Sequence, residues 1–416
     1  MKLFYDLGIL LYGAVLRVIS PFNSKARLWI TGRKNWERSL QLQIERGQQY
    51  IWVHCASLGE FEQGRPVIEA IKKEMPTCKV ILTFFSPSGY EVRKNYSLAD
   101  VICYLPADTP RNSERFISVV RPAGVIFVKY EFWHNYISAL HKKGIPLYLI
   151  SGIFRSSQPF FRWYGMFFRK MLCRFTHIFL QDQVSAELLR GIGVKKLTVA
   201  GDTRFDRVVR LTESAREIHE FEVFRGEEKL FIAGSSWHQD EEIMAQYINS
   251  HPGRMKWVFA PHEPDRQNIE RLEKLFTCRT VKFSEFQGGE SDARVLIIDN
   301  VGMLSSAYRY AYIAAVGGGF GKGIHNVLEP ACWGIPVMFG PNHEKFREAV
   351  ELLKVNGART FKNLEEFTAI LETWLSDGTI YLKSAKAAAL YVSENKGATA
   401  VIMREITSQV INNHCS

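Results

Sequence analysis

Short apolar runs separated by helical stretches recur from about residue 50, and they constrain the fold more than any other feature of this sequence. Such alternation predicts parallel sheets with helices on both faces. The first half of the chain contains Tyr50–Cys55, Lys79–Phe85, Val101–Leu105, Gly124–Val128, Pro146–Ile150 and His177–Leu180. The second half contains Leu230–Ala233, Lys256–Ala260, Val295–Ile298, Tyr312–Val316 and Ile335–Phe339.

Charged sequence between Thr212 and Glu228 separates the two series. The chain has 416 residues, 46% of them hydrophobic, which is enough for two sizeable cores. We therefore expect an α/β fold of two doubly wound, Rossmann-like domains that face a central cleft, at residues 23–210 and 211–416. Ligand sites in such sheets lie at the carboxyl ends of the strands.

Residues 1–22 are apolar but contain Asp6 and Arg17. The uncharged part, Leu7–Leu16, is much shorter than the roughly 20 residues that a bilayer span needs. No small-residue cleavage site precedes the basic residues that follow, so a signal peptide is disfavoured. We expect a helix that inserts shallowly into the cytoplasmic leaflet; the alternative is an ordinary core helix.

No acidic residue occurs between Glu131 and Asp182, where basic residues alternate with aromatic ones. This composition suits either single-stranded nucleic acid or an anionic membrane surface. Together with the apolar N-terminus, it favours the membrane surface. A basic helix that packs its aromatic residues inward is the alternative, and it accounts well for Phe167 and Phe168.

The formal net charge of +10 predicts an acidic partner, whether nucleic acid, anionic lipid or a phosphorylated substrate. The seven cysteines form no Cys-x-x-Cys pair and indicate reduced core residues. The eleven histidines show no metal-binding spacing, so we expect no metal.

A glycine-rich stretch, Gly317–Pro341, follows the strand that ends at Val316. It matches neither the Walker A pattern nor the dinucleotide-binding pattern. His325 and Asn326 are expected to open a helical segment with Glu329 in its first turn, where a carboxylate can reach ribose hydroxyls. We expect a phosphate cradle and nucleotide site without a Walker loop; a plain glycine-rich turn is the alternative.

Carboxylates follow two other predicted strands. Glu60 and Glu131 lie close after Cys55 and Val128, and they could supply a general base and an electrostatic partner. Each could instead be a helix-start carboxylate stabilised by the dipole, an explanation that suits Glu62 best.

Other candidate ligand groups also follow strands. Arg204 could bind a carboxylate or phosphate bidentately. Gly234–Asp240 and Ala260–Arg266 follow strands and begin helices, and His262 in the second could contact a nucleotide, although a lone histidine is more often structural.

Together, four motifs resemble those of the bacterial 3-deoxy-D-manno-octulosonic acid (Kdo) transferases. They are Ser57-Leu-Gly-Glu60, Glu131-Phe-Trp-His-Asn135, Gly234-Ser-Ser-Trp-His238 and Gly323-Ile-His-Asn-Val-Leu-Glu-Pro330. Phe339-Gly-Pro341 and the apolar N-terminus fit as well, and the likeness runs in order over nearly the whole chain. The resemblance implies a membrane-associated glycosyltransferase of GT-B type at the cytoplasmic face of the inner membrane, acting in lipopolysaccharide core biosynthesis.

The resemblance also implies roles for particular residues. Kdo would pass from CMP-Kdo to a hydroxyl of the lipid A precursor, lipid IVA, with inversion. Glu60 would be the general base, and Glu131 and Arg204 would stabilise the transition state. The CMP would lie against Pro261, His262, Val301, Gly302, Met303, Asn326, Val327, Leu328 and Glu329. No metal or cofactor is implied, because dipoles and cations can receive the charge of a phosphate leaving group.

The chain departs from many relatives at two places. They have Arg-His-Pro where this chain has His262-Glu263-Pro264, and Lys where it has Arg204, which keeps the charge but not the geometry. Two other functions remain open: a GT-B glycosyltransferase or epimerase that uses a UDP-sugar, and a basic nucleic-acid-binding protein. A soluble epimerase does not explain the N-terminus, and nucleic-acid binding does not explain the carboxylates. We therefore expect CMP-Kdo, the lipid A precursor and anionic inner-membrane lipids as partners, and no nucleic acid.

Overall fold

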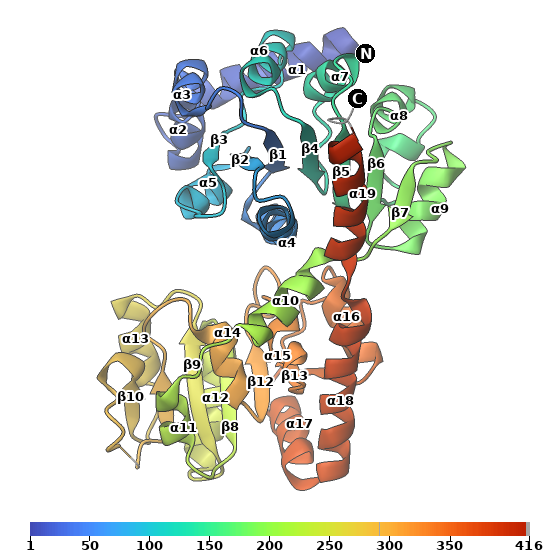
Figure 1. Cartoon of the computed structure of the whole chain (residues 1–416). Coiled ribbons are helices and arrows are strands. Elements are labelled where there is room, and N and C mark those ends of the chain that lie inside the picture. Colours follow the sequence, from blue (N-terminus) through green and yellow to red (C-terminus); the bar gives the residue numbers. More distant parts are fainter. Residues whose placement is uncertain (291, 413–416) are drawn as a thin grey trace. The chain divides into compact units, whose positions relative to one another are not determined.

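The computed structural model describes residues 1–290 and 292–412, without the side chains of residues 410–412 (Figure 1). The chain divides into two compact units, each built around its own sheet. Unit 1 contains residues 1–207 and the chain from residue 396 onward, and unit 2 contains Val208–Asn395.

Unit 1 has a sheet of seven parallel strands in the order β3-β2-β1-β4-β5-β6-β7. The order reverses at β1, which pairs with both β2 and β4. The strands are β1 Tyr50–Cys55, β2 Lys79–Phe84, β3 Val101–Tyr104, β4 Gly124–Val128, β5 Leu147–Gly152, β6 His177–Leu180 and β7 Leu197–Val199.

Helices cover both faces of this sheet because its strands are apolar on both sides. In β1, Tyr50 and Trp52 belong to one core cluster, and Ile51 and Val53 belong to the other. Burial on both faces is what turns a parallel strand into a continuous apolar run. The helical elements are α1 Lys2–Ile19, α2 Ser24–Thr31, α3 Trp36–Gln43, α4 Leu58–Glu74, α5 Pro87–Arg93, α6 Pro110–Val120, α7 His134–Lys142, η1 Pro159–Phe161, α8 Met166–Leu172, α9 Gln183–Gly191, α10 Thr203–Glu213, which continues into unit 2, and α19 Ala398–Asn412.

Unit 2 repeats this plan with seven parallel strands in the order β10-β11-β9-β8-β12-β13-β14. Here the order reverses at β8, which pairs with both β9 and β12. The strands are β8 Leu230–Ser236, β9 Lys256–Pro261, β10 Thr280–Lys282, β11 Val295–Ile297, β12 Ile313–Val316, β13 Val337–Phe339 and β14 Ala358–Thr360. The helical elements are α11 His219–Arg225, α12 His238–Ser250, α13 Arg266–Glu273, η2 Phe283–Glu285, α14 Leu304–Ala307, η3 Tyr308–Tyr310, α15 Leu328–Cys332, α16 Arg347–Lys354, α17 Leu364–Ser376 and α18 Gly378–Asn395.

All eleven predicted strands are present, which confirms two doubly wound α/β sheets. Three further strands, β7, β10 and β14, were not predicted. Each has three residues and lies at an edge of its sheet. Edge strands are solvated on one side, so they lack the long apolar run that marks the central strands.

The end of the chain returns to unit 1, whereas we expected the second domain to run to residue 416. Ile402, Met403 and Ile406 of α19 are buried in the core cluster that also contains α4 and β5. Asp206 fixes the start of α19, since its carboxylate accepts hydrogen bonds from Gly397 N at 2.5 Å and from Thr399 N at 2.6 Å. Without α19, that face of β5 and β6 would lose part of its cover.

Helix α1 lies on unit 1 and is held by a buried carboxylate. Tyr5 Oη donates to Asp108 Oδ2 at 2.6 Å, and Asp108 also accepts the backbone N–H groups of Asn135 and Tyr136 at the start of α7. The Asn135 amide in turn donates to Asp6 Oδ1 at 2.8 Å. Burial raises the pKa of Asp108 to about 6. The polar residues of α1 therefore dock the helix.

The opposite face of α1 is apolar and exposed. Residue exposure is 77% for Leu3, 73% for Phe4 and 63% for Leu11, and no residue of α1 is buried. In the acid-free tract, Phe167 and Phe168 are partly buried against the core cluster, as the inward-packing alternative expects, but Trp163 is 91% exposed. None of the helices described here combines the length and the apolarity needed to cross a bilayer.

We predict that Asp206→Ala loosens α19. The substitution removes the acceptor for two backbone N–H groups and for the Thr399 hydroxyl. Buried groups left without a partner cost about 1–3 kcal/mol each, so the free energy of unfolding should fall by about 2 kcal/mol or more. Amide exchange in residues 398–409 should become faster. Asp206→Asn keeps one acceptor oxygen, so its amide exchange rate should lie between those of the wild type and Asp206→Ala. An unchanged exchange rate in Asp206→Ala would contradict the role of Asp206 in fixing the start of α19.

Candidate active site

The carboxyl ends of β1 and β4 bring two glutamates to the point where the strand order of unit 1 reverses. β1 leads through Ser57 into α4, whose first turn contains Glu60. β4 leads into the loop that contains Glu131. In open α/β sheets, ligands bind at this reversal. Because β1 and β4 are paired neighbours, the two predicted carboxylates belong to one edge of the sheet.

Glu131 is buried, and two N–H groups hold it. Its Oε2 lies 2.9 Å from His54 Nε2 and accepts from Trp133 Nε1 at 2.5 Å. Residue exposure is 7% for Glu131 and 0% for His54. The carboxylate is therefore fixed by its partners and is more than a cap at a helix start.

The tautomer of His54 follows from Thr83. Trp52 Nε1 donates to Thr83 Oγ1 at 2.8 Å, and the same oxygen lies 2.8 Å from His54 Nδ1. When the Thr83 hydroxyl donates a hydrogen bond to Nδ1, Nε2 carries the proton that His54 donates to the Glu131 carboxylate, which can only accept. A buried chain of donors thus ends on the Glu131 carboxylate.

Glu60 has a different environment. It is half-buried, and the Ser57 hydroxyl donates to its Oε2. Among the described residues, no Lys or Arg lies within ion-pair distance of Glu60. Glu62, two residues further along the same helix, pairs with Arg93 and Arg207. A carboxylate without a cationic partner is the better base, because an ion pair stabilises the charged form and makes the carboxylate less ready to take a proton.

Arg204 is the second residue of α10, and it is paired with Asp202. Its Nε and Nη2 donate to Asp202 Oδ2 at 2.9 Å and 2.7 Å. The neighbouring Thr203 Oγ1 donates to the carbonyl of Gln63 in α4 at 2.6 Å. The start of α10 is thereby tied to the helix that contains Glu60, although β7 lies at the far edge of the sheet.

Three residues other than glycine adopt left-handed backbone at strand ends around these sites. They are Lys129 after β4 (φ 69°), Ser151 near the end of β5 (φ 54°) and Ser235 near the end of β8 (φ 50°). Such a backbone is disfavoured for residues with a Cβ. Where it persists, the surroundings hold it in place, and such positions concentrate at functional sites.

In unit 2, three aromatic side chains gather at the reversal between β8 and β12. The rings of Trp237 and His262 stack at 4.8 Å, and those of His262 and His325 at 4.2 Å. Trp237 Nε1 donates to His325 Nε2 at 2.9 Å. Burial, together with the neighbouring His262, lowers the pKa of His325 to about 4, so its imidazole is neutral at pH 7.

The glycine-rich stretch allows the loop after β12 to pack closely against the end of β8, next to this cluster of rings. A Cβ on Gly317 would lie 2.3 Å from the carbonyl oxygen of Ser235. Asp240 Oδ2 accepts from Gly318 N at 3.1 Å and from Trp237 N at 3.0 Å, which ties the glycine loop to the start of α12. Burial raises the pKa of Asp240 to about 6. Glycine here serves close packing of the chain.

The helix after the glycines begins later than we expected, at Leu328 and not at His325 and Asn326. The helix α15 begins at Leu328 and has five residues, so its dipole adds little to a phosphate cradle. Asn326 Nδ2 donates to Glu329 Oε1 at 3.0 Å, which orients that carboxylate. Val327 and Leu328 are fully buried, so only their backbones could contact a ligand.

The remaining predicted residues lie on the same edge of the unit 2 sheet. Pro261 ends β9, and Val301, Gly302 and Met303 follow β11, the neighbour of β9. Val301 is 84% exposed. The edge thus combines exposed apolar surface, stacked rings and an oriented carboxylate.

Sequence reasoning named the acidic residues but missed the groups that orient them. His54, Trp133, Trp237, His325 and Asp240 were seen only as parts of strands or motifs. Their signal was weak but present: each is a polar or aromatic side chain within a predicted strand or in the segment that follows one. The described residues contain no group of three His, Cys, Asp or Glu side chains that could hold a metal ion.

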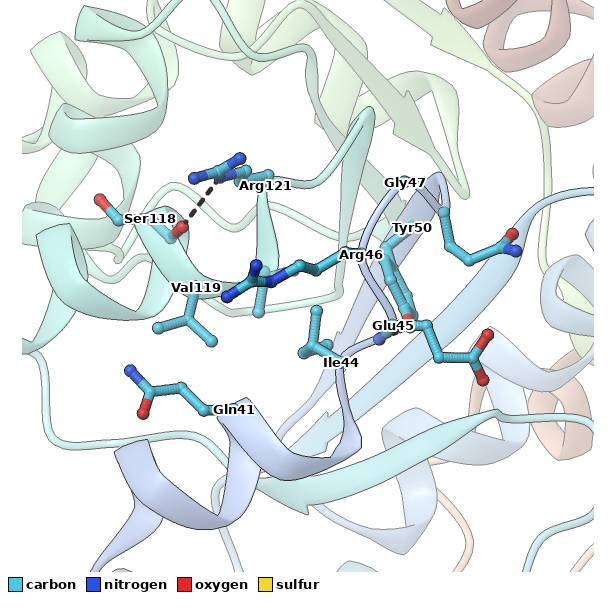
Figure 2. A pocket seen from close by; sticks show the side chains of 11 residues that line it. Gln41, Ile44, Glu45, Arg46, Gly47, Tyr50, Ser118, Val119 and Arg121 are labelled. Atoms are coloured by element: carbon cyan, nitrogen blue, oxygen red, sulfur yellow. Dashed lines mark hydrogen bonds between the residues drawn. The ribbon is translucent and has the colours of Figure 1, made fainter.

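A cavity of about 760 Å³ lies at the amino ends of the unit 1 strands, opposite the carboxyl ends that contain the two glutamates (Figure 2). The segment between α3 and β1 and the end of α6 line it, and Figure 2 shows Arg46 extending toward Val119. Tyr50, the first residue of β1, is part of its wall, which places it at the amino ends of the strands. This cavity is therefore remote from the carboxylates, and we do not assign it to the site.

Comparison with known proteins bears on both units. The family model described as 3-Deoxy-D-manno-octulosonic-acid transferase (kdotransferase) matches residues 33–207. The 3-deoxy-D-manno-octulosonic acid transferase of Aquifex aeolicus is 30% identical over an alignment of 335 residues, and the match covers 78% of this chain and 86% of that protein. The enzyme of the same name from Haemophilus influenzae is 27% identical, over 73% of this chain and 74% of its own.

Among solved structures, the UDP-GlcNAc 2-epimerase from Neisseria meningitidis bound to UDP-GlcNAc has a TM-score of 0.61. The match covers 86% of this chain and 100% of the epimerase at 15% identity. An identity this low shows the fold alone. With the two parallel sheets, it confirms the GT-B type expected from the sequence.

We predict that His325 stays neutral down to about pH 4, whereas an unperturbed histidine titrates near 6.5. Because the folded pKa lies below the unfolded one, the unfolded chain binds more protons between these values, and stability contributed by this group is lost as pH falls from about 6.5 to 4. An NMR titration of the imidazole measures this. Trp237→Phe removes the donor to Nε2 and should raise the pKa; a wild-type midpoint near 6.5 would contradict the buried, hydrogen-bonded geometry.

Proposed function

We propose a specific reaction for this chain, which belongs to the 3-deoxy-D-manno-octulosonic acid transferase family of glycosyltransferases in bacterial lipopolysaccharide biosynthesis. In this reaction, the protein moves Kdo from CMP-Kdo to a hydroxyl of lipid IVA with inversion. The observation that carries the proposal is the pair of glutamates beside the strand reversal in unit 1. Glu60 has no Lys or Arg within ion-pair distance among the described residues, and Glu131 is fixed by two N–H donors.

In the proposed reaction, Glu60 takes the proton of the acceptor hydroxyl. The oxygen then attacks the anomeric carbon of Kdo from the face opposite the CMP. The bond between that carbon and the phosphate oxygen breaks, and CMP leaves with the electron pair. Attack from the opposite face inverts the centre, and one base is sufficient because a phosphate is a good leaving group without a general acid.

The roles of Glu131 and Arg204 follow from charge. The sugar ring gains positive charge as the bond to CMP breaks, as in other glycosyl transfers. A fixed carboxylate such as Glu131 stabilises that charge without reorganising. Arg204 would bind the carboxylate or the phosphate of the donor, and its present partner Asp202 would hold the guanidinium in orientation.

Unit 2 would hold the donor nucleotide. Stacked rings at Trp237, His262 and His325 offer flat surfaces, and Val301 after β11 offers exposed apolar surface. Glu329, oriented by Asn326, is suited to the ribose hydroxyls. Gly302 and Met303, Pro261, and the backbones of Val327 and Leu328 complete the proposed contacts.

Helix α1 would hold the enzyme at the cytoplasmic face of the inner membrane. Its exposed apolar face and the exposed Trp163 suit shallow insertion into an interface, where amphipathic rings and leucines are favoured. The acceptor, a glycolipid, would reach Glu60 from that membrane.

The test is transfer of Kdo to lipid IVA by the full-length protein, with CMP-Kdo generated during the assay and product masses recorded. Parallel reactions contain UDP-GlcNAc in place of the CMP donor. Product masses raised by whole Kdo units support the proposal. Turnover with UDP-GlcNAc but not with CMP-Kdo, by protein shown to be folded, would overturn it in favour of a UDP-sugar enzyme.

We predict that Glu60→Gln lowers kcat for Kdo transfer by about 100-fold or more, because it removes the proposed base. Binding of CMP, measured by calorimetry, should stay within about 2-fold, since the nucleotide contacts come from unit 2. Glu62→Gln is the matched control: the same change on the same helix removes a carboxylate paired with Arg93 and Arg207 and should leave kcat within about 3-fold. Equal activity of both variants would reject Glu60 as the base.

We predict that His54→Phe lowers kcat about 10-fold or more, with KM for both substrates nearly unchanged. The somewhat larger phenyl ring keeps an aromatic contact with Phe127 but lacks the N–H that faces Glu131. His54→Gln, whose amide can donate, should recover part of the activity. Urea unfolding of each variant separates lost positioning from lost folding. A rise in KM with unchanged kcat would contradict a role through Glu131.

A further inference from the structure

A second cavity, of about 510 Å³, lies within unit 1 between α1, the segment from α2 to α3, and the start of α6. Its lining combines cations with apolar side chains and contains no Asp or Glu. Arg17 comes from the last turn of α1, and Arg33 and Lys34 follow α2. None of these three has a carboxylate within ion-pair distance among residues 1–290 and 292–412. The cavity therefore carries uncompensated positive charge.

Arg33 shows this most clearly, because it is the most enclosed of the three. Within the described part of the chain, its guanidinium donates only to backbone carbonyls, those of Phe85 and Leu105 at 2.7 Å and of Trp29 at 3.1 Å. It also lies 4.0 Å from the ring centroid of Trp29. Burial lowers the pKa of Arg33 to about 9. Carbonyls and rings hold a cation in place, but only an anion offsets its charge.

Two further features of the wall favour an anion. Thr109 is the N-cap of α6, a helix of eleven residues without an acidic residue in its first turn, and both Thr109 and Asn112 line the cavity. The N-terminus of such a helix attracts negative charge. Trp29 is 6% exposed, and its Nε1 is a buried donor without an acceptor in the described part of the chain.

The same cavity opens toward the apolar face of α1. Ile9 and Leu10 line it, and Leu10 is 60% exposed, as is its neighbour Leu7. A free anion would use only the cations. A ligand with an anionic head and an apolar tail would use both sides of the cavity.

We propose that this cavity binds the headgroup phosphate of an anionic membrane phospholipid, with the acyl chains along the exposed leucines of α1. Its distance from the chemistry distinguishes this lipid from the glycosyl acceptor. Arg33 lies against Phe85, Phe85 packs on Trp133 at 4.7 Å, and Trp133 donates to Glu131. Two rings thus separate Arg33 from Glu131, and in this proposal the lipid is a structural partner that seats α1 and takes no part in the transfer.

The test uses full-length protein and short-chain phosphatidylglycerol below the concentration at which it forms micelles, so that no membrane surface potential contributes. Gly13 lines the cavity, and a Cβ there would meet no atom within 4 Å, so Gly13→Leu fills the cavity without changing charge. Gly8→Leu is its matched control on the same helix, because Gly8 is equally open but does not line the cavity. A second pair, Arg17→Gln/Lys34→Gln against Lys25→Gln/Arg27→Gln, removes equal charge inside and outside the cavity.

We expect one phospholipid per chain by native mass spectrometry, bound about 10-fold more weakly by Gly13→Leu and by Arg17→Gln/Lys34→Gln. Both controls should stay within about 2-fold, and inorganic phosphate should bind more weakly than the lipid. Equal loss in the cavity variants and their controls would overturn the site in favour of diffuse surface charge. Inorganic phosphate that binds as tightly as the lipid would overturn the lipid assignment. Lipid binding is read without the transferase assay, so either result is independent of the proposed reaction.

Discussion

Parallel strands that are buried on both faces can place polar side chains only at their ends, and both units of this protein are organised by that constraint. The central strands, such as β1, β4, β8 and β12, are apolar except near their carboxyl ends, where His54 and Ser236 lie, and they pair with neighbours on either side. Helices follow each strand at the same edge, so the loops that can hold polar groups gather there. The reversal of strand order then opens space at two places, and both contain the candidate groups.

The carboxyl edges differ from the cores in how their backbone is held. Cores are packed by apolar side chains, whereas the edges depend on individual hydrogen bonds and on glycine. Gly317 allows the loop after β12 to touch Ser235, and Asp240 joins the two loops through backbone N–H groups. Left-handed residues such as Lys129 persist because the neighbouring strand fixes them, as the bond from Lys129 N to Ile150 O shows. A site built in this way is rigid without being apolar.

Buried charges in unit 1 are compensated in two contrasting ways, and the contrast separates chemistry from anchoring. Glu131 receives two N–H donors from aromatic side chains, which leaves a fixed negative charge at the strand ends. Among the described residues, Arg33 contacts carbonyls and rings but no carboxylate, which leaves a positive charge open to a ligand. The rings of Phe85 and Trp133 connect the two groups. Catalysis by the carboxylates and seating of α1 on a lipid would therefore share one aromatic framework.

The sequence by itself determined the two-sheet plan, because long apolar runs with helical spacers admit few other folds, and it placed Glu60 and Glu131 after paired strands. Its motifs also identified the family. Only the tertiary structure decided that α19 covers unit 1, that β7, β10 and β14 complete the sheets, and that Val327 and Leu328 point into the core. It alone revealed that His54 holds Glu131. Each of these depends on contacts between residues far apart in the chain, and local patterns of hydrophobicity carry no information on which distant surface remains to be covered.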